Sequence, residues 1–248
     1  MEKIWNEERF KKAVEHTKKM EELYSPVIRR CVQETTAYEI SEPMRRKEYR
    51  NQFINTLSFS NTDTVSAAFQ YRLGRTAILN FASYFSPGGG FIQGAIAQEE
   101  ALCHESFLYN VLKEQTEFYE KNNRDFNSYL YYNRGMYSKH VLFFRDKVQS
   151  FDVITCAAPD YRRAKEFVSN AENSIALLNR IAFIRYLAEM HHVSTLILGA
   201  YGCGVFQQDP DEVAQYMQLV FHGADIENVI FAVPGNDRNA KVFRERFS

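Results

Sequence analysis

The sequence predicts a three-layer α/β domain in which a mixed, mainly parallel sheet lies between helices. From residue 53 to the end, short apolar stretches alternate with segments of helical spacing, which is the pattern of such domains. Several of the apolar stretches are nearly continuous, as in strands covered on both faces. The chain has no internal repeat or linker, so we expect one domain over residues 1–248, with residues 1–50 as a helical N-terminal accessory.

Length and composition exclude several classes of protein. The 248 residues are 45% hydrophobic, which is ample for a core, and 30 basic residues against 31 acidic ones leave a net charge of −1. General binding to nucleic acid or to an acidic membrane is therefore not expected. The four cysteines lack the spacing of a zinc site or a disulfide framework and favour a reducing, cytoplasmic location. The N-terminus is too charged for a signal peptide, and no apolar run approaches the ~20 residues of a membrane span.

The individual elements follow from periodicity and from helix start and stop signals. Thr76–Phe81 is the clearest buried strand. The stretch Asn61–Asp63 is expected to cap one helix, and Asp209 with Pro210 to open another. Strands are expected at residues 53–59, 76–81, 129–132, 141–144, 152–159, 195–199 and 228–233. Helices are expected within residues 1–50, at 63–73, 98–117 and 162–190, from 209 onward, and at 237–247.

Two glycine-rich loops follow two of the predicted strands and lead into helices. They contain Gly88, Gly89 and Gly90 in the first, and Gly202, Cys203 and Gly204 in the second. A single loop of this kind favours a tight turn, but two at the carboxyl ends of strands favour a ligand such as a diphosphate. Neither loop matches a P-loop or a dinucleotide fingerprint. Cys203 is either a reactive thiol or, more simply, a small packing residue.

Glu99 and Glu100 lie where the first loop meets the next predicted helix. Within a helix, successive side chains diverge by about 100°. At a loop–helix junction, however, one glutamate can hold a sugar hydroxyl while the other transfers a proton. Such an acid needs a dry pocket that raises its pKa, and Phe91, Ile92 and Phe206 are candidates to build it. The alternative is a pair of first-turn glutamates that only interact with the helix dipole.

Three motifs in order resemble the signature of bacterial-type poly(ADP-ribose) glycohydrolases: residues 80–83 (NFAS), 87–90 (PGGG) and 98–103 (QEEALC). Residues 153–159 and 198–206 are similar to the mid-chain strand and the second loop of that family, and the resemblance covers roughly residues 35–248. It implies a macrodomain fold and a hydrolase that cleaves ribose–ribose glycosidic bonds of poly(ADP-ribose) to release ADP-ribose. No cofactor and no metal are implied.

The resemblance also implies roles for individual residues. Glu100 matches the general acid/base, and Glu99 matches the neighbour that fixes ribose hydroxyls. The implied substrate-binding residues are Asn80, Gly88, Gly89, Gly90, Gln98, Gly202, Cys203, Gly204, Val205 and Phe206. The sequence departs from the family pattern at residues 84–86, 207–208 and 234–235, beside the expected ligand path.

Two other functions stay open at this stage. One is a non-catalytic ADP-ribose-binding macrodomain module, and the other is a hydrolase of mono-ADP-ribosylated protein or nucleic acid. The expected partners are poly(ADP-ribose) or ADP-ribose as ligand and an ADP-ribosylated macromolecule as substrate. No membrane partner is expected.

Overall fold

The computed structural model describes residues 7–41 and 53–248, and the strands in these residues form one seven-stranded sheet in the order β1-β4-β5-β3-β6-β7-β2. The strands are β1 (Thr36–Ile40), β2 (Thr56–Ser60), β3 (Thr76–Phe81), β4 (Asn133–Phe144), β5 (Val148–Cys156), β6 (Thr195–Leu198) and β7 (Asn228–Ala232). The five strands at one side of the sheet, β5, β3, β6, β7 and β2, are parallel to one another. By contrast, β4 is antiparallel to both of its neighbours, β1 and β5. The sheet is therefore mixed.

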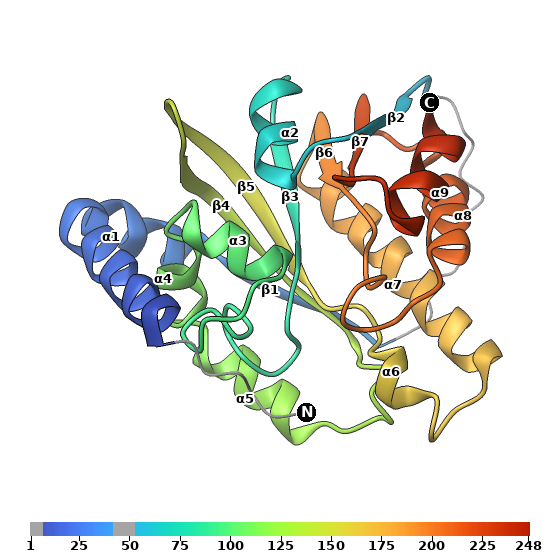
Figure 1. Cartoon of the computed structure of the whole chain (residues 1–248), viewed down its shortest axis with the longest axis horizontal. Coiled ribbons are helices and arrows are strands. Elements are labelled where there is room, and N and C mark those ends of the chain that lie inside the picture. The colour runs from blue at the N-terminus through green and yellow to red at the C-terminus, as the bar shows by residue number, and fades with distance from the viewer. Residues whose placement is uncertain (1–6, 42–52) are drawn as a thin grey trace.

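Helices cover both faces of the sheet (Figure 1). They are α1 (Glu7–Glu34), α2 (Thr64–Gln70), α3 (Gln98–His104), α4 (Leu108–Leu112), α5 (Thr116–Arg124), α6 (Tyr161–Ala164), α7 (Asn170–Met190), α8 (Pro210–Phe221) and α9 (Arg238–Phe247). One core packs α1 to α5 against one face, and a second core packs α7, α8 and α9 against the other. This arrangement confirms the predicted three-layer α/β/α fold.

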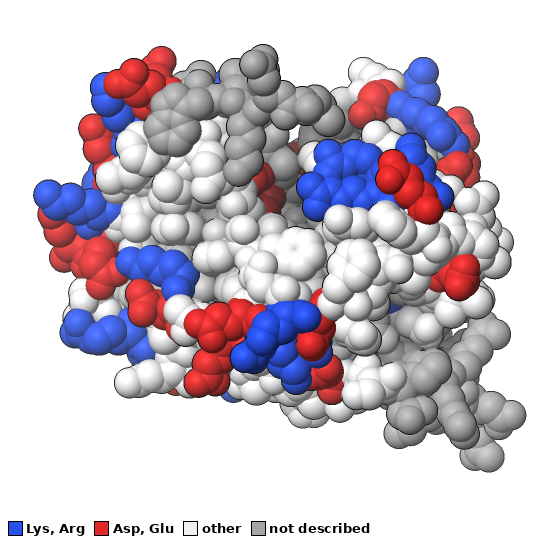
Figure 2. Space-filling view, turned by 90° about the horizontal axis from the view of Figure 1, so that it is seen from below, with Lys and Arg blue, Asp and Glu red and all other residues white. Residues whose placement is uncertain are grey.

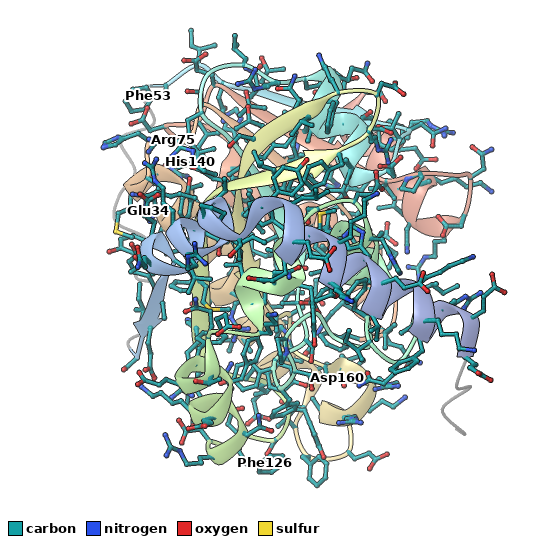
Figure 3. All side chains as sticks on the ribbon, turned by 90° about the vertical axis from the view of Figure 1, so that its left-hand side faces the viewer. Glu34, Phe53, Arg75, Phe126, His140 and Asp160 are labelled. Atoms are coloured by element: carbon teal, nitrogen blue, oxygen red, sulfur yellow. The ribbon has the colours of Figure 1, made fainter. Side chains whose placement is uncertain are left out.

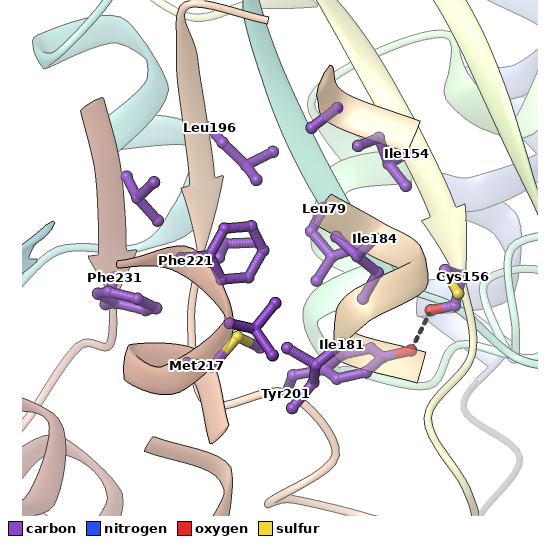
Figure 4. Close-up of a cluster of buried hydrophobic side chains, with 14 of the residues drawn as sticks. Leu79, Ile154, Cys156, Ile181, Ile184, Leu196, Tyr201, Met217, Phe221 and Phe231 are labelled. Carbon is purple, nitrogen blue, oxygen red and sulfur yellow. Dashed lines mark hydrogen bonds between the residues drawn. The ribbon is translucent and has the colours of Figure 1, made fainter. Parts of the chain in front are cut away.

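The central strands supply side chains to both cores because successive residues of a strand point to opposite faces. In β6, Leu196 and Leu198 lie in the core beneath α7 and α8, whereas Ile197 lies in the core beneath α1 to α5. All three are fully buried, which explains the continuous apolar pattern of this strand. Figure 4 shows the core beneath α7 and α8, where the Tyr201 hydroxyl donates a hydrogen bond of 3.1 Å to the Cys156 carbonyl.

Helix starts were predicted best where a side chain caps them. Asp63 accepts a hydrogen bond from the Ser66 N–H and caps α2. Asp209 accepts from the Asp211 N–H, and Pro210 occupies the first helical turn of α8. Both predicted caps are confirmed.

The prediction of helix over residues 1–50 is wrong in its last part. The chain leaves α1 at Glu34, and residues 36–40 form β1, which pairs with β4 at the edge of the sheet. The rest of that range, residues 42–50, lies outside the described residues, as do residues 1–6. In Figure 3, α1 crosses the front of the molecule, and its inward side chains are Ala13, Met20, Ile28 and Cys31.

Three further predictions need correction. Residues 129–132 are not a strand, because Tyr129 and Tyr131 have positive φ and their rings pack on neighbouring side chains. The helix expected over 98–117 is divided into α3, α4 and the start of α5, and between α3 and α4 the Ser106 hydroxyl donates to the Leu102 carbonyl and accepts from the Leu108 N–H. The helix expected over 162–190 breaks before Ser169, which forms a capping box with Glu172.

Among the described helices, none is long and apolar enough to span a membrane.

Candidate active site

The carboxyl ends of β3, β5, β6 and β7 lie side by side in the sheet, and both glycine-rich loops leave from this edge. Figure 2 shows the molecule from this side, with uncharged side chains over the middle of the surface and charged ones around them. Because β3 pairs directly with β6, the loop after β3 and the loop after β6 are neighbours. The two loops predicted to share a ligand are therefore at the same place in the fold.

The first glycine-rich loop is a series of closed turns. The Gly89 N–H donates to the Ser86 carbonyl (3.1 Å), and the Phe91 N–H donates to the Gly88 carbonyl (3.0 Å). Gly88 and Gly89 have φ of +64° and +59°, a region that favours glycine. Phe91 is fully buried against the rings of His104 and Tyr109 and anchors the loop.

Glu99 and Glu100, in the first turn of α3, both reach this loop and are only 3% and 6% exposed. Glu99 accepts hydrogen bonds from the Ser83 N–H (2.7 Å) and from the Asn80 amide (3.1 Å). Glu100 accepts from the Gly90 N–H through Oε1 (2.8 Å). Its second oxygen, Oε2, is buried and has no partner in the described part of the chain.

Burial raises the pKa of Glu99 to about 8, although hydrogen bonds from Ser83 and Asn80 lower it, and the adjacent charge of Glu100 raises it further. Glu99 therefore retains a proton at neutral pH. This is the condition that acid–base chemistry requires.

Asn80 and Gln98 position the glutamates. The Gln98 side chain accepts from the Phe81 N–H (2.9 Å) and donates to the Leu79 carbonyl (2.8 Å), so it joins the start of α3 to the end of β3. Asn80 is fully buried beneath Glu99, and its Oδ1 has no partner within residues 7–41 and 53–248. Both were predicted to bind substrate. In the structure, the amide of Gln98 pairs with the strand, and the amide of Asn80 donates to Glu99.

The second loop is more open than the first. Gly202 has a φ of +77°, and the Gln208 N–H closes the loop onto its carbonyl (3.0 Å). The N–H groups of Gly204, Val205 and Phe206 have no acceptor among the described residues. Val205 is 59% exposed. A row of free N–H groups next to a cavity suits an anionic ligand.

A cavity of about 660 Å³ lies beside the second loop. The predicted site residues on its wall are Gln98, Gly202, Gly204, Val205 and Phe206. Asn80, the three glycines of the first loop, Glu99 and Glu100 are not on this wall but form a hydrogen-bonded cluster around the two buried carboxyl groups, and Gln98, next to Glu99 in the chain, lines the cavity. Cys203 belongs to neither group, because it packs against the core and burial raises the pKa of its thiol.

Several residues that line the cavity carry no role predicted from the sequence. Asp63 and Glu105 line the cavity, and both form ion pairs with Arg145. Asp237 lines it as well and caps α9. The cap pattern at Asp63 was visible in the sequence, but no local pattern links Arg145 to residues 40 and 82 positions away.

An aromatic wall borders both parts of the site. Tyr84 stacks on Tyr131 with ring centroids 4.2 Å apart and planes at 6°, and Phe85 meets Tyr131 edge-on at 5.4 Å. Phe206 approaches Tyr131 from the cavity side at 6.3 Å. The bulky residues before the glycines, which depart from the family pattern, are therefore built into the packing of the site.

The family model for the microbial-type PARG catalytic domain matches residues 3–146. The chain belongs to this family. Its structure is similar to that of poly(ADP-ribose) glycohydrolase (PARG) from Thermomonospora curvata bound to the inhibitor ADP-HPD. The identity is 28%, the match covers 98% of this chain and 100% of that chain, and the TM-score is 0.84.

The T267R mutant of PARG from Deinococcus radiodurans in complex with ADP-ribose is 30% identical, with 89% of this chain and 97% of that chain covered and a TM-score of 0.79. No curated protein matches the chain. Membership of the microbial-type PARG family confirms the resemblance inferred from the glycine and glutamate motifs. Among the described residues, no three His, Cys, Asp or Glu side chains gather as metal ligands would.

Proposed function

We propose that the protein hydrolyses the ribose–ribose glycosidic bonds of poly(ADP-ribose) and releases ADP-ribose, with Glu100 as the general acid and base. The observation that carries this assignment is the state of its two carboxyl oxygens. Oε1 is held by the Gly90 N–H, whereas Oε2 is buried and free to hold a proton or meet a substrate oxygen. The activity itself is supported by family membership and by the PARG structures with bound ADP-ribose or inhibitor.

In this mechanism, Glu100 protonates the oxygen that leaves as the bond from the anomeric carbon breaks. The sugar becomes oxocarbenium-like. The Glu100 carboxylate left by the first step then takes a proton from the water that adds to the anomeric carbon. One residue thus serves both steps, unlike the usual glycosidase with two separate carboxylates. Glu99 uses its remaining lone pairs to hold ribose hydroxyls, because each of its oxygens already accepts one hydrogen bond from the protein.

The cavity supplies the rest of the binding site. Its volume of about 660 Å³ is in the range of pockets for ligands of nucleotide size. The free N–H groups of Gly204, Val205 and Phe206 suit the diphosphate, and the Phe206 ring forms an apolar side for the attached sugar. We place the whole activity in one domain.

A cytoplasmic location is part of the proposal. It is supported by the four cysteines, Cys31, Cys103, Cys156 and Cys203, which are all free thiols.

A second assignment exchanges the roles of the two glutamates. It is favoured by the pKa of Glu99, which is raised to about 8 and makes Glu99 the better proton carrier at neutral pH. Against it, both oxygens of Glu99 are bound by protein donors.

The test compares Glu100→Gln, Glu99→Gln and the control Glu114→Gln, whose side chain is exposed. We expect Glu100→Gln to lower kcat on poly(ADP-ribose) by roughly a thousandfold while the Kd for ADP-ribose stays within about tenfold. The control should match the wild type. A larger loss of kcat in Glu99→Gln than in Glu100→Gln would exchange the two roles. A wild type that binds ADP-ribose but releases none from the polymer would instead be a binding module.

A further inference from the structure

Three aromatic side chains on the side of the molecule where the strands of the sheet end form a cluster that the proposed mechanism does not use. The aromatic ridge, as we call it, consists of Phe126, Tyr129 and Phe167. Phe126 meets Tyr129 and Phe167 at centroid distances of 5.1 and 6.4 Å, and Tyr129 meets Phe167 at 5.9 Å. Phe126 and Phe167 are 61% and 59% exposed. Figure 3 shows Phe126 at the lower edge of the molecule, below Asp160. Exposed apolar side chains that gather in one patch indicate a binding surface.

The ridge is continuous with the catalytic side of the molecule. Tyr129 packs on the buried pair Tyr84 and Tyr131, and Phe206, which lines the cavity, packs on the same pair. The N–H that binds the Glu99 carboxylate belongs to the residue immediately before Tyr84. The aromatic wall of the active site therefore continues outward into the ridge.

Positive charge lies beside the ridge. The Arg163 guanidinium is 5.2 Å from the centroid of the Tyr129 ring. Arg162 and Arg163 share a single buried carboxylate, Asp160, at 3.3 and 3.6 Å. Two guanidinium groups against one carboxylate leave an excess positive charge. The backbone N–H of Arg162 donates to the Phe206 carbonyl at 3.0 Å, so this segment of the backbone is held next to the cavity loop.

The chemistry of the substrate fits this combination. When a ribose–ribose bond of poly(ADP-ribose) breaks, the ribose that leaves carries an adenine and is linked to a diphosphate. We propose that the aromatic ridge is a second nucleobase subsite, in which the adenine of the leaving unit stacks on Phe126 and Phe167 while Arg163 meets its diphosphate. Stacking of bases on aromatic rings next to arginine is a common mode of nucleotide binding. This inference rests on the proposed function, because a single ADP-ribose in the cavity has no second adenine.

The test separates binding at the ridge from binding in the cavity. Phe126→Ala and Phe167→Ala should each raise KM for free poly(ADP-ribose) roughly tenfold, with kcat within about twofold. The Kd for ADP-ribose itself should not change. Phe126→Tyr keeps the ring and should restore the KM. The control is Tyr186→Ala, which removes an exposed aromatic residue of α7 outside the ridge.

Three results would overturn the ridge as a subsite. The first is an unchanged KM for the polymer in both alanine variants. The second is a Kd for ADP-ribose that rises as much as the KM. The third is a raised KM for ADP-ribosylated protein alone, which would indicate a protein-binding surface. Binding can also be measured without turnover, by comparing the Kd of the polymer for Glu100→Gln with its Kd for the double variant that also carries Phe126→Ala. The ridge as a subsite requires a higher Kd in the double variant. A wild type that releases no ADP-ribose would contradict the proposed function and not the ridge, provided that this Kd still depends on Phe126.

Discussion

The two glycine-rich loops leave adjacent strands but differ in how closely they are packed. A Cβ on Gly89 would lie 2.7 Å from the nearer Glu100 oxygen and 2.9 Å from a Glu99 oxygen. A Cβ on Gly204 would have no neighbour within 4 Å. The N–H of Gly90 is bound to a carboxylate, whereas the N–H groups of residues 204–206 have no acceptor among the described residues.

In the proposed mechanism, this difference separates chemistry from recognition. Proton transfer needs a donor held to a fraction of an ångström, so the first loop is built around the carboxylates and leaves no space between them and the backbone. A loop that receives a charged ligand must keep its donors free until the ligand arrives. We therefore expect changes in the first loop to lower kcat and changes in the second loop to act mainly on binding.

The largest effect is expected from Gly89→Ala. The added methyl group would push both carboxylates out of place, and the φ of +59° adds strain of about 1–2 kcal/mol. We expect kcat on poly(ADP-ribose) to fall by at least about a hundredfold. Gly235→Ala is the control, because its φ of +93° brings backbone strain but its Cβ would meet nothing within 4 Å. An equal loss of kcat in both variants would mean that strain alone is responsible and that contact with the carboxylates is not.

A second prediction concerns stability and the buried charge of the first loop. The folded protein holds a proton on Glu99 up to about pH 8, whereas an unfolded glutamate loses it near its ordinary pKa of 4.5. Between these values the folded state binds more protons, so its stability falls as the pH rises. Glu99→Gln cannot lose a proton and should escape this decline. Its Tm relative to the wild type should therefore increase from pH 5 to pH 8.

The same measurement on Glu114→Gln gives the control, since this exposed carboxyl group should show a Tm difference that changes little with pH. A Tm difference for Glu99→Gln that is the same at pH 5 and pH 8 would contradict the raised pKa. It would also remove the main observation in favour of Glu99 as the proton carrier.

Much of this fold was readable from local signals. β3 was predicted with its observed bounds because both faces of the strand are buried and its sequence is nearly continuously apolar, and α2 and α8 were found through their aspartate caps. β1 was missed because its evidence lies elsewhere: residues 36–40 are mostly exposed or half-buried, and they become a strand by pairing with residues 133–137. Pairing between residues about a hundred positions apart leaves no local pattern.

The site shows the same division between local and distant information. The glycines and glutamates were identified from the sequence, but the division of labour between Glu99 and Glu100 was available only through the family resemblance. In the structure, the N–H groups of Ser83 and Gly90 bind different carboxylates, and the proposed division of roles rests on this difference. The amide of Gln98, which is predicted to bind substrate, also hydrogen-bonds to the backbone of β3. Backbone donors carry no residue-specific signal, so the sequence could not predict these contacts.

The smallest effect is expected from Gly204→Ala, which tests the open loop directly. Its Cβ would have nothing within 4 Å, and its φ is not positive, so neither a clash nor strain is introduced. We expect an unchanged Tm, an unchanged kcat and a KM within about threefold of the wild type. Gly202→Ala in the same loop is the comparison, because its φ is +77° and its Cβ would lie 2.9 Å from Ala158 Cβ and from Gln208. If Gly204→Ala lowered kcat as strongly as Gly89→Ala, the second loop would take part in the chemical step, and the separation of chemistry from recognition would fail.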